Sequence, residues 1–209
     1  MVKTNLMKKL LLCSLAIGLL ASCNKSKEKE TTTTKDSTVV ATEAPKTEKD
    51  SASMVTAFDP SSIPVTTADV GTFPYLTVPD RIEYINGTGG QKEYDETFVP
   101  INGAFISVKG PVFDAGIKAK DKQLWSEAYA KDSYAKKITD LGGIKLFDER
   151  INKTELDKYD HKLGSTLDYW NEPVQVYALK KKDSTIVYFQ LLTNSASGGI
   201  RIAEAGELK

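Results

Sequence analysis

The hydrophobic and polar positions divide the chain into three stretches of different character. An apolar run of 11 residues, 10–20, follows three lysines near the N-terminus. Residues 24–57 are then mostly polar, and all 18 aromatic residues lie at or after Phe58. Strand and helix periodicities begin beyond this point. The pattern predicts a leader at 1–22, a flexible tether rich in Thr, Lys, Glu and Ser at 23–68, and one globular domain at 69–209.

Alternating apolar and polar residues in the last stretch predict a mainly antiparallel sheet. The expected strands are 81–85, 96–101, 104–109, 112–119, 144–147, 174–179, 185–193 and 199–205. Asn102-Gly103 favours a tight hairpin turn, and Gly110-Pro111 is expected to break the chain between the strands 104–109 and 112–119. The first four strands are then expected to form a meander. Both faces of 185–193 are apolar, which predicts a central strand covered on each side.

Two helices are expected between the strands. The first runs from Asp121, as its N-cap, to about Leu141, where Gly142-Gly143 stops it. Its expected buried stripe comprises Leu124, Ala128, Ala135 and Ile138, flanked by Tyr134 and Leu141 on one side and by Trp125 and Tyr129 on the other. The second spans 152–159, where Asn152 and Glu155 form a capping-box pattern. The expected fold class is α+β: a mainly antiparallel sheet with two helices, in a single domain after a disordered tether.

The leader and the cysteine that follows it predict an exported, lipid-anchored protein. Lysines, a short apolar run and small residues before Cys23 are the order of a bacterial export signal. The apolar run is too short to span a bilayer, which takes roughly 20 residues. The stretch "LASC", ending at Cys23, resembles a lipobox, so we expect Cys23 to become the lipidated N-terminus of the mature chain. Several acyl chains on one residue would anchor the protein durably. The expected location is the bacterial cell envelope, at the periplasmic or outer face of the outer membrane.

Cysteine content and charge narrow the expected partners. Cys13 lies in the leader and Cys23 is expected to carry lipid, so no disulfide is expected within one mature chain. The full chain has 28 basic and 28 acidic residues, and loss of the three leader lysines leaves 25 basic residues and a net charge of −3. This balance argues against nucleic acid as a partner, because basic patches dominate binding to phosphate backbones.

The sequence contains no recognisable set of catalytic, cofactor-binding or metal-binding residues. His161, the one histidine, is flanked by Asp157 and Asp160 and could act as a base or metal ligand, but no nucleophile motif accompanies it and a solvated helix end is the simpler interpretation. Paired carboxylates for glycoside hydrolysis could come from Asp148, Glu149, Glu155 and Asp157, although a charged, solvated turn and helix start explains them as well. "GTGG" at 87–90 lacks the lysine of a phosphate-binding loop, and Ser197 lies in a glycine turn rather than in a nucleophile motif.

Trp125 and Tyr129 are candidates for a contact surface. They lie off the centre of the expected helix stripe, so their rings could be partly exposed and stack on a sugar or dock a protein. Large aromatic residues are more often part of the core, and that alternative stays open. No cofactor is expected.

Several stretches of the domain, in order, resemble a known family module. "GTFPYLTVPDRIEYIN", "YDETFVPINGAFISVKGPVF", "LGGIKLFDERINKTELDKY", "LDYWNEPVQVYAL" and "IVYFQLLTNSASGGIRI" are similar to the module that precedes the peptidoglycan-binding domain in OmpA-family outer-membrane lipoproteins. The resemblance covers nearly all of 69–203 and implies an envelope location and the fold of that module. The Asn, Asp and Arg pattern by which OmpA-like domains hold peptidoglycan has no counterpart here, and the chain ends at Lys209. Binding to peptidoglycan is therefore not expected.

Two function hypotheses follow from the sequence. The first is a membrane-anchored envelope lipoprotein with a non-enzymatic domain that binds or positions an envelope protein or glycan. The alternative is an enzyme of unrecognised type that acts on envelope glycans or peptides. The sequence favours the first, because enzymes generally need a convergent nucleophile, base or metal site.

Overall fold

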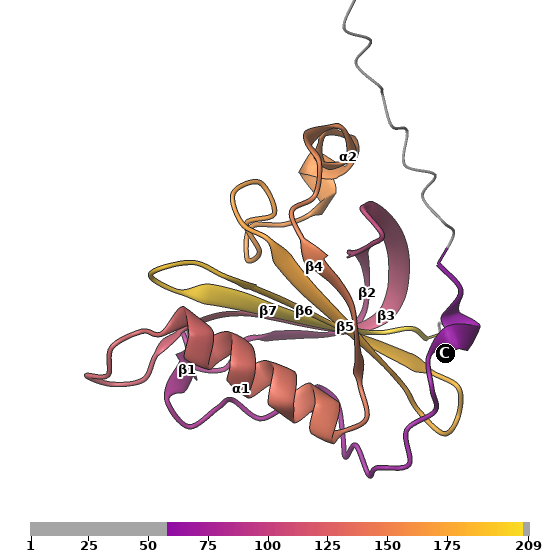
Figure 1. Ribbon diagram of the computed structural model, residues 1–209, viewed down its shortest axis with the longest axis horizontal. Coiled ribbons are helices and arrows are strands. Elements are labelled where there is room, and N and C mark those ends of the chain that lie inside the picture. Colours follow the sequence, from indigo (N-terminus) through magenta and orange to yellow (C-terminus); the bar gives the residue numbers. More distant parts are fainter. Residues whose placement is uncertain (1–57, 207–209) are drawn as a thin grey trace, which may run out of the picture. The chain divides into compact units, whose positions relative to one another are not determined.

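Seven strands form one sheet in the computed structural model, which describes residues 58–206. The elements are η1 (Pro60–Ser62), β1 (Ile82–Tyr84), β2 (Gly90–Ile101), β3 (Ala104–Ala119), α1 (Glu127–Asp140), β4 (Ile144–Glu149), α2 (Lys153–Tyr159), η2 (Asp160–Lys162), β5 (Val174–Lys180), β6 (Ile186–Thr193) and β7 (Gly198–Glu204). The strand order is β1-β3-β7-β6-β5-β4, with β2 also paired to β3, and each of these pairs is antiparallel (Figure 1). The predicted fold class, a mainly antiparallel sheet with two helices, is confirmed.

The hairpin of β2 and β3 forms as the sequence predicts, but it is longer than expected. Asn102 and Gly103 connect the strands, and both have positive φ, 53° and 80°, as a two-residue hairpin turn requires. β3 continues through Gly110-Pro111 instead of breaking there. The pairing of β2 and β3 shifts register between Lys92 and Asp95, opposite Pro111. This irregularity lets the strand accept a residue that has no N–H to donate. The predicted meander is therefore replaced by one long β3, which pairs with β1 and β2 along the same edge.

The first helix begins later than the sequence predicts. Asp121 has a φ of 53° and does not cap α1; the Ser126 side chain does, accepting a hydrogen bond from the Tyr129 amide. The stripe shifts accordingly, and Leu124, which precedes the helix, is 86% exposed. The buried helix residues are Ala130, Tyr134 and Ile138. The helix ends as predicted before Gly142-Gly143, and the Gly143 amide donates to the carbonyl of Ile138.

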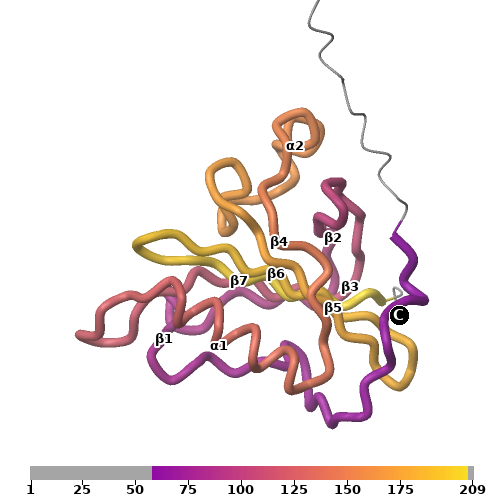
Figure 2. Tube along the Cα trace, in the orientation of Figure 1, coloured from indigo at the N-terminus to yellow at the C-terminus, as the bar shows by residue number. Residues whose placement is uncertain are grey.

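The sheet separates two hydrophobic clusters, each covered by a different part of the chain. α1 packs across one face, where Tyr134 and Ile138 contact a cluster that includes Phe189 of β6. The opposite face is covered by α2 and by the curled end of the β2–β3 hairpin (Figure 2). β6 contributes Phe189 to the first cluster and Tyr188 to the second, and it has a strand on each side. The predicted central position of this strand is confirmed.

The segment before Asp69 belongs in part to the folded domain. Ile63 is buried in the cluster on the α2 side, and Thr66 donates a hydrogen bond to the carbonyl of Leu141. Val65 pairs with Lys180 as an isolated parallel bridge. The expected domain start at Asp69 is therefore too late, because isolated apolar residues such as Ile63 can anchor a segment that has no periodic pattern. The leader, Cys23 and the rest of the expected tether lie outside the described residues.

Candidate ligand-binding pocket

Three polar side chains form a row across the middle of the sheet, on the face opposite α1. In the strand register Asp114 of β3 lies opposite Arg201 of β7, and Arg201 lies opposite Gln190 of β6. Arg201 is 5% exposed and Gln190 is fully buried. Their neighbours along each strand are apolar and face the α1 side. A buried charged residue at the centre of a sheet is unusual, and it needs partners to be tolerated.

The Arg201 guanidinium is held by two hydrogen bonds. Nη2 donates to Oδ2 of Asp114 at 3.0 Å, and Nη1 donates to the carbonyl of Leu163 at 2.9 Å. Burial alone would lower the pKa of Arg201, but Tyr169 and Asp114 raise it, so the net shift is upward and the side chain stays charged. A guanidinium has five N–H donors, and these two bonds use only part of that capacity.

Two atoms of the polar row have no hydrogen-bond partner among the described residues. Oδ2 of Asp114 accepts from both Arg201 and the Thr166 hydroxyl, whereas its Oδ1 is buried and accepts from none. Gln190 accepts from the Tyr169 hydroxyl at 2.6 Å, whereas its Nε2 has no acceptor. Buried polar atoms without partners are uncommon in folded proteins, and each one needs an explanation.

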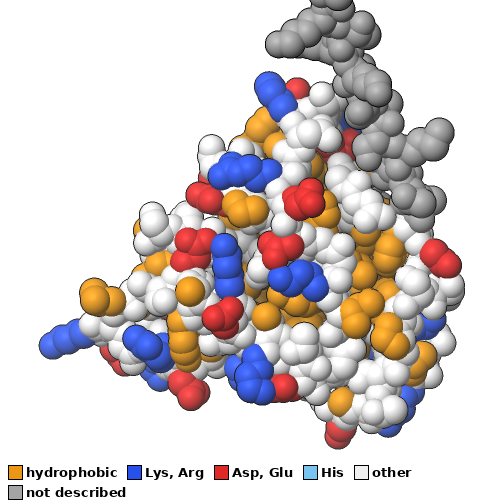
Figure 3. All heavy atoms as spheres, viewed as in Figure 1, with side chains coloured by type: hydrophobic (Ala, Val, Ile, Leu, Met, Phe, Trp, Pro, Cys, Tyr) orange, Lys and Arg blue, Asp and Glu red, His pale blue; other side chains and the backbone are white. Residues whose placement is uncertain are grey.

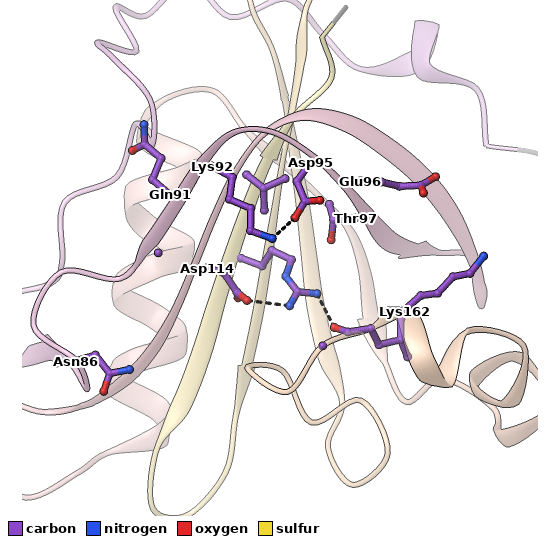
Figure 4. Close-up of a pocket in the computed structure, with 13 residues that line it drawn as sticks. Asn86, Gln91, Lys92, Asp95, Glu96, Thr97, Asp114 and Lys162 are labelled. Atoms are coloured by element: carbon purple, nitrogen blue, oxygen red, sulfur yellow. Dashed lines mark hydrogen bonds and ion pairs between the residues drawn. The ribbon is translucent and has the colours of Figure 1, made fainter. Parts of the chain in front are cut away.

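A pocket of about 560 Å³ opens above Asp114 and Arg201. Its volume lies within the range of small-ligand sites, about 300–1,000 Å³. Lys92 and Asp95 project into it from β2, toward Asp114 (Figure 4). Lys162, Leu163 and Gly164 form the wall that faces β2, and the remaining lining residues are Asn86, Gly90, Gln91, Glu96, Thr97 and Val112. The pocket therefore lies between the curled β2 and the segment that follows α2.

The charges around the pocket are mostly paired with each other. Lys92 Nζ and Asp95 Oδ2 are 2.6 Å apart, and this hydrogen bond is the main cause that lowers the pKa of the Asp95 carboxyl. Glu96 accepts from the Ser107 hydroxyl and lies 3.8 Å from Lys109, on the strand next to it.

Lys162 has no ion pair with any described residue; its ammonium lies over the Phe98 ring, 5.6 Å from the ring centre. Lys162 is thus the lining cation that forms no ion pair with a carboxylate in residues 58–206.

Contacts just before the segment 162–164 and within it position this segment against the sheet. Tyr159, at the end of α2, contacts the rings of Phe98 and Phe105 on the β2–β3 hairpin. Gly164 has a φ of 69°, and a Cβ at this position would lie 3.2 Å from Nη2 of Arg201. A glycine here meets both needs, since other residues rarely adopt this φ and their Cβ would crowd the guanidinium.

The "GTGG" stretch lies beside a second, smaller cavity. Gly89 and Gly90 line this cavity of about 230 Å³ together with Thr166, Gly116 and Asp114. Asn86, Gly90 and Asp114 line both cavities. Asp114 therefore stands where the two spaces meet.

The side chains singled out in the sequence lie elsewhere. Cys23 lies outside the described residues. Trp125 and Tyr129 are half-buried against the α1-side cluster; Trp125 donates from Nε1 to the carbonyl of Asn194, and the Arg81 guanidinium lies 5.0 Å from the centre of the Tyr129 ring. The His161 side chain is 98% exposed. Trp125, Tyr129 and His161 do not line the pocket.

One of the four suggested carboxylates is not solvated. Glu155 is buried, accepts a hydrogen bond from the Phe105 amide at 3.0 Å and pairs with Lys158 at 2.6 Å. Asp148, Glu149 and Asp157 are exposed. Glu155 faces the hairpin rather than the pocket, so it fixes α2 against the sheet. The solvated interpretation of Glu155 is therefore wrong, because helix periodicity turns its side chain toward the Phe105 backbone.

Sequence reasoning missed Asp114 and Arg201, although a signal was present. Both lie inside strands that were expected, Arg201 between Ile200 and Ile202, and Asp114 between Phe113 and Ala115. Strand alternation places these charged residues on one face, but it does not say whether that face is solvated or buried. A charged residue flanked by apolar residues in a strand near the centre of a sheet is the pattern to look for.

Other kinds of site were also sought in residues 58–206. No group of three or more His, Cys, Asp or Glu side chains in this part of the chain is placed to hold a metal ion. Within the same residues, no helix has the length and apolar character needed to cross a membrane. On the face seen in Figure 3, basic and acidic side chains alternate, with hydrophobic side chains visible between them.

Comparisons of the chain with protein-family models, with curated proteins and with solved structures find no match. The resemblance to the OmpA-associated module thus stays a prediction from the sequence.

Proposed function

We propose that this chain is a lipid-anchored protein of the bacterial cell envelope, at the outer membrane, whose folded domain is a non-enzymatic binding module. The observation that carries the binding function is the pocket over Arg201 and Asp114. Its polar groups converge from β2, β3, β7 and the segment after α2, and a buried guanidinium forms its floor. Concave sites with a few convergent polar groups are the usual form of small-ligand sites.

The charge and position of the pocket groups support binding more than catalysis. Asp95 is paired with Lys92, and Asp114 is paired with Arg201 and Thr166. A general base or nucleophile needs a side chain that is free to exchange a proton or attack a substrate. Paired and hydrogen-bonded charges are better suited to hold a ligand in one orientation.

The binding function can be tested in the full lipid-anchored chain. A photoreactive amino acid replaces Lys92, whose side chain projects into the pocket (Figure 4), and in a matched variant it replaces Asp132, which is exposed on α1. After irradiation in the producing bacterium, mass spectrometry should find an adduct of defined mass at position 92 but not at 132. Equal adducts at the two positions, or none at 92, would contradict a binding role for the pocket.

Anchoring is tested separately at Cys23. We expect Cys23→Ala to abolish incorporation of a fatty-acid analogue and to move the protein out of the membrane fraction, because the thiol is the proposed attachment point for lipid. Cys13→Ala, in the leader, is the matched control and should leave labelling unchanged. Persistent labelling of the Cys23 variant would rule out this assignment.

A further inference from the structure

We propose that the pocket over Arg201 and Asp114 recognises its ligand through a single carboxylate group. This inference rests on the proposed binding function and names the ligand class for the same pocket. Three properties of the lining carry it: the sign of the unpaired charge, the number of unpaired charges and the free donors of a buried guanidinium.

The first property is the sign of the lining charge that has no ion-pair partner. Lys92 pairs with Asp95, and Arg201 pairs with Asp114. Glu96 also lines the pocket, and it lies 3.8 Å from Lys109, which does not. Lys162 then remains as a lining cation without an acidic partner in the described part of the chain. A ligand that carries negative charge would therefore meet an unpaired ammonium at the rim, opposite β2.

The second property is the number of lining charges that have no ion-pair partner. One unpaired cation balances one negative charge. A dianionic phosphate would bring a further negative charge close to Asp95, Glu96 and Asp114, and like charges in a partly buried site repel each other. The lining therefore favours a carboxylate, which carries one charge, over a phosphate group.

The third property is the donor capacity beneath the pocket. Arg201 uses two hydrogen bonds to fix its orientation, to Asp114 and to the carbonyl of Leu163. A guanidinium locked in this way presents its remaining N–H groups in a fixed geometry, which is the arrangement that suits a planar carboxylate. Gly164 keeps the neighbouring backbone close to the guanidinium without a side chain that would fill the space.

The buried Oδ1 of Asp114 adds a requirement on the rest of the ligand. This oxygen has no donor among the described residues, and Asp114 lines both the main pocket and the smaller cavity. An N–H or O–H group next to the ligand's carboxylate would supply that donor. Peptide amides and sugar hydroxyls both offer such a group, so the two sources share the chemistry that the pocket would recognise.

Calorimetry on the full chain in detergent separates the sources with matched probes. The first pair is acetyl-Gly-Ser-Gly with a free carboxylate and the same tripeptide with a C-terminal amide. The second pair is glucuronate and glucose, and inorganic phosphate is measured alongside them. In at least one pair, the acid should bind about tenfold or more tightly than its neutral partner, because hydrogen bonds to a charged group are the stronger kind. The pair that shows the difference identifies the source.

Variants at exposed lysines assign the effect to the pocket without disturbing the core. Lys162→Glu should weaken binding of the acid about five- to tenfold. Lys122→Glu makes the same charge change at an exposed position outside the pocket and should leave the affinity unchanged. Both variants should keep the thermal unfolding midpoint of the unchanged protein.

The outcomes that would overturn the carboxylate inference are distinct from those that would overturn the binding function. Equal binding of an acid and its neutral partner, or tighter binding of phosphate than of either acid, would overturn the inference while leaving a binding pocket. Equal losses in Lys162→Glu and Lys122→Glu would also overturn it. If no probe binds, the carboxylate inference fails, and the adduct at position 92 decides separately whether the pocket binds anything.

Discussion

The two faces of the sheet are built from the same strands but are covered by different elements. The α1 side is closed by α1 and by the segment 70–78, over apolar residues such as Phe189, Ile200 and Ile202. The opposite side is covered by three separate pieces: the curled hairpin, α2 and the segment after it. Both buried charged side chains of the described residues, Glu155 and Arg201, lie on this second side.

The difference follows from what each cover can satisfy. On the α1 side, the helix saturates its own backbone hydrogen bonds, and the segment 70–78 adds apolar side chains such as Leu76, so this cover contributes mainly apolar contacts. The irregular cover on the other face offers backbone groups to charged side chains: the Leu163 carbonyl accepts from Arg201, and the Phe105 amide donates to Glu155. The comparison indicates that one face mainly supplies stability, while the other supplies the proposed binding site and carries the buried charges.

The largest expected effect is a loss of stability from a substitution on the α1 side. Phe189→Ala removes a fully buried ring at the centre of β6 and leaves a cavity between the sheet and α1. The free energy of unfolding should fall by about 3–5 kcal/mol, measured by urea titration. A loss below about 1 kcal/mol would show that this face is not the tightly packed side. Phe189→Leu retains much of the volume and should cost markedly less.

The next variants distinguish the contribution of the buried ion pair to stability from that of packing alone. Arg201→Met leaves the Asp114 carboxylate half-buried without its cation and should lower the free energy of unfolding by about 2–3 kcal/mol. Replacing both residues, with Asp114→Leu and Arg201→Met together, should restore part of that loss, because no uncompensated charge remains. Strictly additive losses in the double variant would argue that the two residues do not act as a pair.

A smaller effect with a defined pH dependence is expected at Glu155. Burial raises the pKa of the Glu155 carboxyl, but the hydrogen bonds from Lys158 and the Phe105 amide lower it by more, so the net shift is downward. The charged carboxylate therefore stabilises the fold above its unfolded pKa of about 4.3, and this stabilisation is lost as the pH falls below that value.

Glu155→Gln tests this linkage. At pH 7 we expect the variant to be about 1–2 kcal/mol less stable than the unchanged protein. The difference should shrink as the pH is lowered through 4, because the carboxyl of the unchanged protein is then protonated as well. Asp157→Gln, at an exposed position on the same helix, is the control and should show little effect. A Glu155→Gln difference that grows toward low pH would have the wrong sign for a carboxylate with a lowered pKa.

The smallest effect is expected at Leu124. The sequence places Leu124 in the buried stripe of the first helix, but the structure leaves it exposed ahead of Ser126. Leu124→Ser should therefore change the free energy of unfolding by less than about 0.5 kcal/mol. Ile138→Ser, at a buried position of α1, is the contrast and should cost several times more. A large loss at Leu124 would mean that this side chain is covered by something beyond the described residues.

The sequence predicts the elements of this fold better than their packing. The Asn102-Gly103 turn, the Asn152 cap and the two apolar faces of β6 are local signals, and each appears where it was expected. The start of α1 differs because Asp121 and Ser126 are both good caps, and the choice between them depends on the path of the preceding loop. The role of Asp114 and Arg201 depends on strand register across β3 and β7, which no local pattern specifies.

Chemical-shift mapping by NMR tests the central claim of a division between the two faces most directly. The full chain, labelled with ¹⁵N and held in detergent, is titrated with the free-acid tripeptide or glucuronate, whichever binds in calorimetry. The account predicts that the amide signals that move belong to residues 90–97, Asp114, 162–164 and Arg201, while those of α1 stay unchanged. Movements concentrated on α1, or spread equally over both faces, would contradict the claim.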